Sequence, residues 1–116
     1  MDYQGEEIRL GGKIRHLKYP ITGLKIIAAK YGTVVAGFNK MKTMNPDFDE
    51  ETLDDIAVLI YAGLVHEDES ITLRAVSNML NMDNMTPLFG KILAAFNGST
   101  PQEEEGGSEG GPGESR

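Results

Sequence analysis

The segment from residue 47 to residue 66 constrains the fold more than any other part of the chain. It opens with acidic residues around Phe48, which suit a helix start because carboxylates cap free backbone N–H groups and complement the helix dipole. Apolar side chains then recur at helical spacing in a broad stripe made of Leu53, Ile56, Ala57, Leu59, Ile60 and Leu64. The sequence therefore predicts that this helix, ending near Gly63 and His66, is the central one of a bundle.

A short β-hairpin is predicted ahead of this helix, between residues 8 and 19. Gly11 and Gly12 separate two runs in which apolar and polar residues alternate, the pattern of two strands joined by a two-residue turn. The side chains expected to face inward are Ile8, Leu10, Ile14 and Leu17. Because a lone hairpin is only marginally stable in water, it must pack against the helices.

Two helices are predicted between the hairpin and the central helix. Thr22 is expected to cap the first, which ends near Tyr31, and Thr33 to cap the second, which carries Val34, Val35, Phe38 and Met41. Gly32 between them suits the left-handed residue that follows a helix end. A single helix kinked at Gly32 is the alternative.

Two more helices are predicted after the polar loop that follows His66. Thr72 is expected to cap a short helix that ends around Asn81. Thr86 and Pro87, a capping residue followed by a proline that suits the first helical position, are expected to open the last helix, which ends at residues 97 and 98. Its apolar face holds Leu88, Ile92, Leu93 and Phe96.

The rest of the chain is rich in Gly and Glu and has no apolar side chain other than proline. Such a segment cannot bury enough surface to offset the entropy of ordering. We therefore expect an α+β fold that is mainly α: residues 1–97 form one domain, a hairpin packed on about five short helices, and residues 98–116 a disordered acidic tail.

The net charge of -7 is unevenly spread along the 116 residues. Residues 1–44 hold eight Lys or Arg and three Asp or Glu, residues 45–97 hold two against ten, and residues 98–116 hold one against five. This separation favours contact with charged protein surfaces, or head-to-tail contact between copies in a homo-oligomer, over binding of nucleic acid. Ordinary solvated faces explain the same pattern.

Several kinds of chemistry lack their residues in this sequence. There is no Cys, and the glycines form no phosphate-binding motif. The acids from Asp47 to Asp55 lack the spacing of a calcium loop, and His66 beside Glu67 and Asp68 fits the solvated end of a helix better than a metal or proton-transfer site. We therefore expect no enzymatic activity, no cofactor and no metal site.

The location of the protein is predicted from what the start of the sequence lacks. The first ten residues carry acids where a signal peptide carries Lys or Arg, and no apolar run reaches the ~18 residues of a membrane span. We expect a cytoplasmic protein that does not bind a membrane.

A small DNA-binding regulator is the alternative function. Eight Lys and Arg residues precede residue 44, and residues 33–43 would be the candidate recognition helix. That helix holds only two Lys on a mostly apolar surface, which suits packing better than a DNA groove. A third possibility, an adaptor or antitoxin-like interaction module of a mobile element, shows the same absence of catalytic groups.

Methionines recur every three residues where the last two helices meet, at Met79, Met82 and Met85. They can serve simply as core filler. If they are exposed, their flexible side chains suit a helical partner of varied sequence, with Phe89 extending the strip. Met79, Met82, Met85 and Phe89 are therefore the candidate partner-binding residues.

Three phrases of the sequence resemble one known family. These are Lys30-Tyr31-Gly32-Thr33, the run LDDIAVLIYAGLVHED at residues 53–68, and Ile71-Thr72 at the start of the next helix. Together with the hairpin they resemble, over residues 6–97, the tail assembly chaperones of long-tailed bacteriophages, prophages and gene transfer agents. The run from residue 57 to residue 68 carries most of the resemblance.

The resemblance implies a protein made only during tail morphogenesis and left out of the mature virion. It would bind the long helical tape measure protein in the host cytoplasm and keep it soluble. In many members a ribosomal frameshift appends a second segment that recruits tail tube subunits. This chain would be the short form, and its Gly/Glu-rich end the linker.

Overall fold

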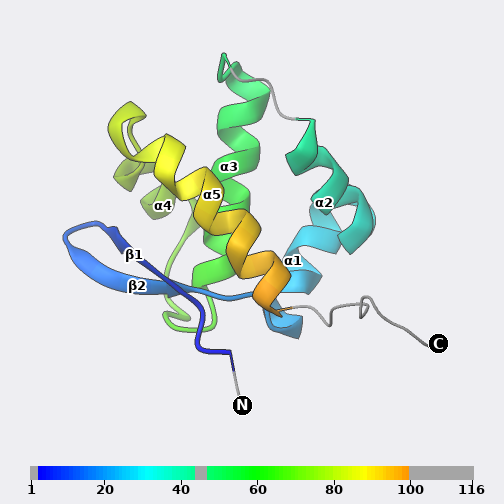
Figure 1. Cartoon of the computed structure of the whole chain (residues 1–116), viewed down its shortest axis with the longest axis horizontal. Helices are drawn as coiled ribbons and strands as arrows, with labels where there is room; N and C mark the ends of the chain where they lie inside the picture. Colours follow the sequence, from blue (N-terminus) through cyan, green and yellow to red (C-terminus); the bar gives the residue numbers. More distant parts are fainter. Residues whose placement is uncertain (1–2, 44–46, 100–116) are drawn as a thin grey trace.

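The computed structural model describes residues 3–43 and 47–99, in which a two-stranded hairpin precedes five helices, as the sequence predicts (Figure 1). The fold is α+β and mainly α. The elements are, in chain order, β1 (Glu6–Leu10), β2 (Lys13–Leu17), α1 (Ile21–Tyr31), α2 (Val34–Lys42), α3 (Glu50–Leu64), α4 (Leu73–Met79) and α5 (Met82–Ser99).

The hairpin turns at Gly11 and Gly12, as predicted, but one of its expected core residues faces outward. Ile8, Leu10 and Leu17 are buried, whereas Ile14 is 47% exposed. The antiparallel register explains the error: Ile14 pairs with Arg9 on the outer face, while Arg15 pairs with Ile8 on the inner face. Because residues that pair directly share a face, a two-residue turn cannot place both Leu10 and Ile14 inside.

Helix α3 is the central helix, as predicted, and it contacts α1, α4, α5 and β2 (Figure 1). Its first turn is capped by Asp49, whose side chain accepts a 2.9 Å hydrogen bond from the Thr52 N–H. Its last turn packs closely against the hairpin: a Cβ on Gly63 would lie 2.6 Å from Leu17 Cδ2. The backbone N–H of Lys18 also donates to the Gly63 carbonyl at 3.1 Å.

Helices α1 and α2 are separate, so the single kinked helix is excluded. Gly32 between them has φ 97°, a left-handed conformation that favours glycine, and the Thr33 side chain caps α2 by accepting from the Ala36 N–H. The cap predicted at Thr22 is wrong. Helix α1 begins at Ile21, directly after Pro20, and has no side-chain cap.

Helix α4 is capped by Thr72, as predicted, but α5 begins at Met82 rather than near Thr86 and Pro87. Two asparagines provide hydrogen-bond acceptors for backbone N–H groups at this earlier start. The Asn81 side chain accepts from the Asn84 N–H at 3.1 Å, and the Asn84 side chain accepts from the Asn81 N–H at 2.9 Å. This reciprocal arrangement has the geometry of a capping box. Pro87 therefore lies inside the helix, where it forgoes one backbone hydrogen bond.

Helix α5 continues through Gly98 and Ser99, which the sequence assigns to the tail. The Ser99 hydroxyl oxygen accepts a 2.9 Å hydrogen bond from the Tyr19 N–H. The remaining tail prediction concerns residues 100–116, which lie outside the described residues, as does the predicted break at Asn45 and Pro46.

No single helix in the described part of the chain is both long and apolar enough to cross a membrane. Helices α1 and α2 taken together reach the required length and composition, but the chain bends by 74° between them.

Candidate protein-binding surface

An open groove of about 910 Å³ lies between the N-terminal half of α3 and the corner where α4 meets α5. Its apolar lining comes from both sides: Leu53 and Ala57 from α3, and Leu80, Met82 and Met85 from the corner. Leu53 is 41% exposed and Met82 is 64% exposed. Exposed large apolar side chains that meet in a concave surface are typical of a binding site.

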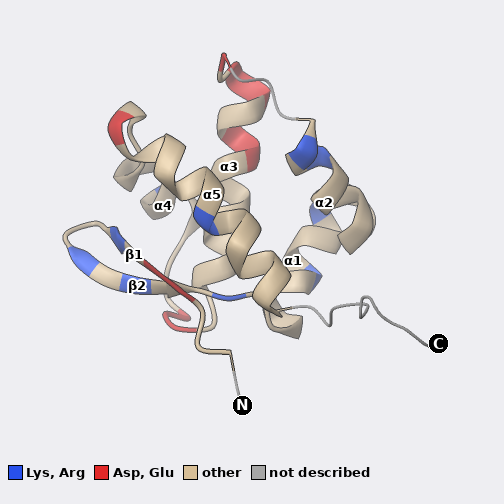
Figure 2. Cartoon of the chain, in the orientation of Figure 1, with Lys and Arg blue, Asp and Glu red and all other residues tan. Residues whose placement is uncertain are grey.

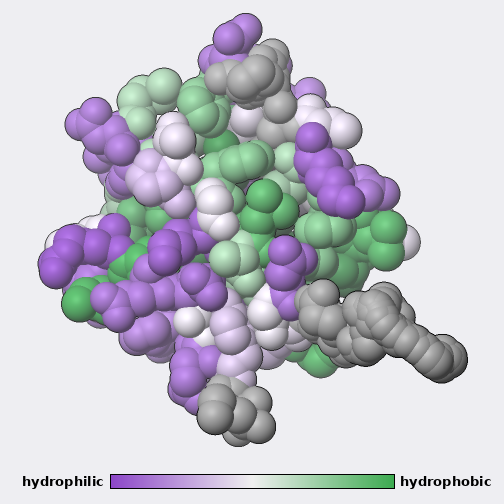
Figure 3. All heavy atoms as spheres, viewed as in Figure 1, coloured by the Kyte–Doolittle hydropathy of each residue, from purple (hydrophilic) through white to green (hydrophobic). Residues whose placement is uncertain are grey.

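The rim of this groove is acidic. Asp49, Glu50, Glu51 and Asp54 line it, and no Lys or Arg does so among the described residues. Figure 2 shows the acidic segments at the start of α3 and at the start of α5, and Figure 3 shows apolar surface between these two ends. The groove therefore combines an apolar floor with a negative edge.

The structure brings together only two of the four side chains predicted to bind a partner. Met82 is exposed at the groove, and Met85 forms part of its floor but is only 2% exposed. Met79 points toward the hairpin, with its sulfur 3.8 Å from an Arg15 guanidinium nitrogen. Phe89 is half-buried against the core. The predicted strip is thus not one continuous surface.

The groove also includes three apolar residues that the sequence did not predict to bind a partner: Leu53, Ala57 and Leu80. The signal that could have found Leu53 is its position in the first turns of α3, next to Glu50, Glu51 and Asp54. The apolar stripe of α3 is too wide for the adjoining helices and strands to bury completely. The part of the stripe that remains exposed lies at the acidic N-terminal end of α3.

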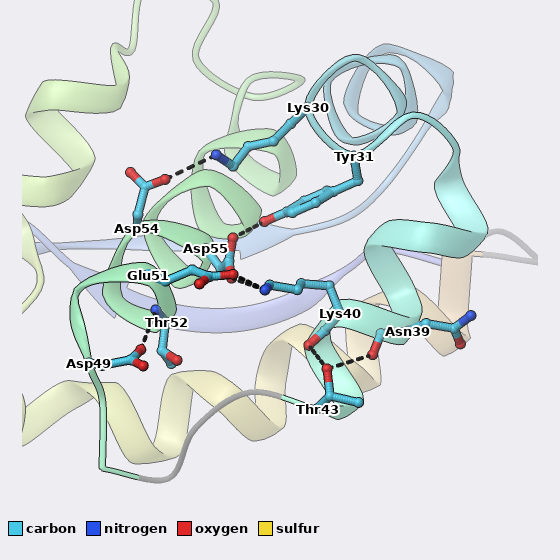
Figure 4. A network of polar contacts seen from close by, with 10 residues as sticks. All are labelled: Lys30, Tyr31, Asn39, Lys40, Thr43, Asp49, Glu51, Thr52, Asp54 and Asp55. Atoms are coloured by element: carbon cyan, nitrogen blue, oxygen red, sulfur yellow. Dashed lines mark hydrogen bonds and ion pairs between the residues drawn. The ribbon is translucent and has the colours of Figure 1, made fainter.

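On another side of α3, a polar network joins it to α1 and α2 (Figure 4). Lys30 pairs with Asp54 at 3.0 Å, and Lys40 pairs with Glu51. Asp55 is buried; its Oδ1 accepts a 2.5 Å hydrogen bond from the Tyr31 hydroxyl, and its Oδ2 lies 3.8 Å from Lys40 Nζ. Burial and this hydrogen bond raise the pKa of Tyr31 above its ordinary value.

Some of the basic residues considered for DNA binding make contacts within the fold instead. Arg15 is buried: its Nε donates to the Leu10 carbonyl at 2.9 Å, and it pairs with Asp68. In the candidate recognition helix, Lys40 is paired with Glu51, and Lys42 Nζ lies 4.6 Å from the centre of the Phe38 ring. These contacts leave this helix poorly suited to reading a DNA groove.

His16 and His66 come together beside Glu67, where the hairpin meets the loop after α3. Both the backbone N–H and the imidazole of His16 contact the Glu67 carboxylate, at 2.9 Å and 2.8 Å. The His66 ring nitrogen lies 2.9 Å from the His16 carbonyl oxygen. Burial acts to raise the pKa of Glu67, but the hydrogen bonds from His16 outweigh it and lower that pKa. These hydrogen bonds connect the hairpin to the residues that directly follow α3.

No group of three or more His, Asp or Glu residues in the part of the chain that the structure describes could hold a metal ion. The chain matches no protein-family model, no curated protein and no solved structure.

Proposed function

We propose that this chain is a binding protein without enzymatic activity, and that it holds an apolar helical client in solution. The observation that supports the proposal is the open groove beside α3, because its apolar lining includes the exposed Met82, whose flexible side chain can fit varied partners. The groove is open at the surface beside the packed core, so binding there requires no unfolding of the domain.

The resemblance to tail assembly chaperones suggests which client this is. We propose that the client is the tape measure protein of a long-tailed phage or prophage, held in the host cytoplasm during tail assembly. Recruitment of tail tube subunits would require a longer, frameshifted form. In that role the chain would be absent from the mature virion.

Co-expression tests this proposal. A tape measure protein encoded beside this chain's gene should be insoluble when expressed alone, and soluble and co-purified when expressed with this chain. A tape measure protein that stays insoluble, or that is soluble but does not co-purify, would overturn the proposal. Salt-sensitive retention of the purified chain on DNA would instead support the DNA-binding regulator.

A further inference from the structure

We propose that the groove between α3 and the α4–α5 corner binds one amphipathic helix that carries Lys or Arg beside its apolar stripe. This inference deepens the proposed function, because it specifies the chemistry that a client segment needs. It rests on two separate features of the groove: its apolar floor and the sign of its rim charge.

The floor selects an apolar stripe. Leu53 and Met82 are both well exposed on opposite walls of the groove, and Ala57 and Met85 are buried between them. An inserted Leu or Met side chain would remove both exposed groups from water, which favours binding in proportion to the apolar area buried. A helix fits such a groove through residues spaced three or four apart.

The rim selects positive charge beside that stripe. Glu51 and Asp54 already pair with Lys40 and Lys30, whereas Glu50 has no ion-pair partner within the described residues. A client Lys or Arg could therefore pair with Glu50 without displacing an existing ion pair. Complementary charge of this kind contributes specificity and faster association more than affinity.

The C-terminal segment of the chain lacks the chemistry that the groove would select. Residues 100–116 contain five Glu and one Arg and no apolar side chain other than proline. Such a segment offers no apolar stripe to the floor, and its charge has the same sign as that of the rim. The proposed occupant is therefore a segment of another molecule.

Two synthetic peptides provide the test. Each has about 18 residues and forms an amphipathic helix with Leu at helical spacing; one carries Lys on the flanks and the other carries Glu at the same positions. The full chain is titrated into each labelled peptide while the fluorescence anisotropy of the peptide is recorded. The Lys peptide should bind roughly tenfold more tightly than the Glu peptide at low salt. Added salt should reduce this preference.

Matched variants locate the binding. Met82→Gln should weaken binding of the Lys peptide roughly fivefold to tenfold, because it removes an exposed apolar group without adding charge. Val35→Gln is the control, since Val35 is 66% exposed, also lies in a first helical turn, and does not line the groove. Glu50→Gln should reduce the preference for the Lys peptide, whereas Glu69→Gln, in the loop before α4, should not.

Several results would overturn the inference: equal binding of the two peptides, equal effects of Met82→Gln and Val35→Gln, or self-association that Met82→Gln abolishes while neither peptide binds. Co-expression of the same variants separates the two proposals. If Met82→Gln still keeps the tape measure protein soluble as wild type does, the proposed function stands and the groove is not the site. If the wild-type chain does not keep the tape measure protein soluble, the client assignment fails. The peptide titration alone then shows whether the groove binds an amphipathic helix.

Discussion

The two halves of α3 differ in what surrounds them. Residues 56–60, which run from the middle of the helix into its C-terminal half, are all buried, and the last turn lies so close to the hairpin and α1 that only glycine fits at Gly63 and Gly23. In the N-terminal half, Glu50, Glu51, Leu53 and Asp54 are exposed, and this half forms ion pairs with α1 and α2. One helix thus joins a closed core to an open surface.

This difference separates the part of α3 that packs in the core from the part that we propose binds a partner. Apolar burial around the C-terminal half favours folding in proportion to the apolar area removed from water. The N-terminal half keeps its helical shape through the Asp49 cap and the favourable position of acids at a helix start. It can therefore leave apolar groups exposed for a partner without loss of the fold.

The largest expected effect compares truncation in the two halves. Ile60→Ala should lower the free energy of unfolding by about 2–5 kcal/mol, because Ile60 is fully buried and truncation leaves a cavity. Leu53→Ala should cost less than about 1 kcal/mol, because Leu53 is 41% exposed and has little packing to lose. Urea denaturation followed by circular dichroism measures both. Similar losses for the two variants would mean that the halves do not differ as described.

The close approach of α1 to the C-terminal half gives the second comparison. A Cβ on Gly23 would lie 2.4 Å from the Ala62 carbonyl oxygen, so Gly23→Ala must push α1 from α3 and should destabilise by about 1–3 kcal/mol. Gly90→Ala is the matched control. Beyond the adjacent residues and the nearby backbone of α5, no atom of the described residues lies within 4 Å of its added Cβ, so the higher helix propensity of Ala should stabilise by about 0.5–1 kcal/mol. Opposite signs in thermal melting would confirm the contact, and a stabilising Gly23→Ala would exclude it.

Much of the fold could be predicted because its signals are local. The Gly-Gly turn, the caps at Thr33 and Thr72 and the broad stripe of α3 are each set by a few neighbouring residues. The start of α5 was missed because Asn81 and Asn84 cap it reciprocally, a less familiar pattern than Thr86 followed by Pro87. Ile14 was misplaced because its apolar character was given more weight than the pairing parity of the strands.

The groove could not be predicted in the same way, because it depends on how elements far apart in sequence pack. Periodicity places Leu53 on the apolar stripe of α3 but does not reveal that no helix covers it. The three-residue repeat of methionines marks the right region. The contact of the Met79 side chain with Gly11 and Arg15 of the hairpin separates it from Met82.

The polar contact between α1 and the N-terminal half of α3 gives a third, smaller effect. Tyr31→Phe should lower the free energy of unfolding by about 1–2 kcal/mol at neutral pH, because the buried Asp55 Oδ1 loses its hydroxyl donor. Tyr61→Phe is the control: Tyr61 is half-buried in α3 and makes no hydrogen bond among the described residues, so it should change stability by less than about 0.5 kcal/mol.

The pH dependence of the same contact has a defined sign. Because burial and the hydrogen bond to Asp55 raise the pKa of Tyr31 in the folded state, its contribution to stability is fully present below the ordinary tyrosine value of 10.0. It is lost as the pH rises beyond that value. Tyr31→Phe should therefore flatten the alkaline fall in stability relative to Tyr61→Phe, and identical alkaline profiles would contradict the assignment.

The smallest expected effect lies at the closed end of α3, where Glu67 holds the hairpin through His16. Burial acts to raise the pKa of Glu67, but the hydrogen bonds from His16 lower it below the ordinary 4.5, so ionised Glu67 favours the folded state. Its contribution is present above pH 4.5 and is lost as the pH falls through the lower folded-state pKa. Because both side chains are more than one-third exposed, solvent screening limits the gain to about 0.5 kcal/mol or less. Glu67→Gln should therefore lower the melting temperature slightly at pH 7 and not at all near pH 3, whereas Glu69→Gln should have no effect at either pH. A loss at pH 7 as large as that of Ile60→Ala would mean that this polar contact, rather than apolar burial, holds the closed end of α3 together.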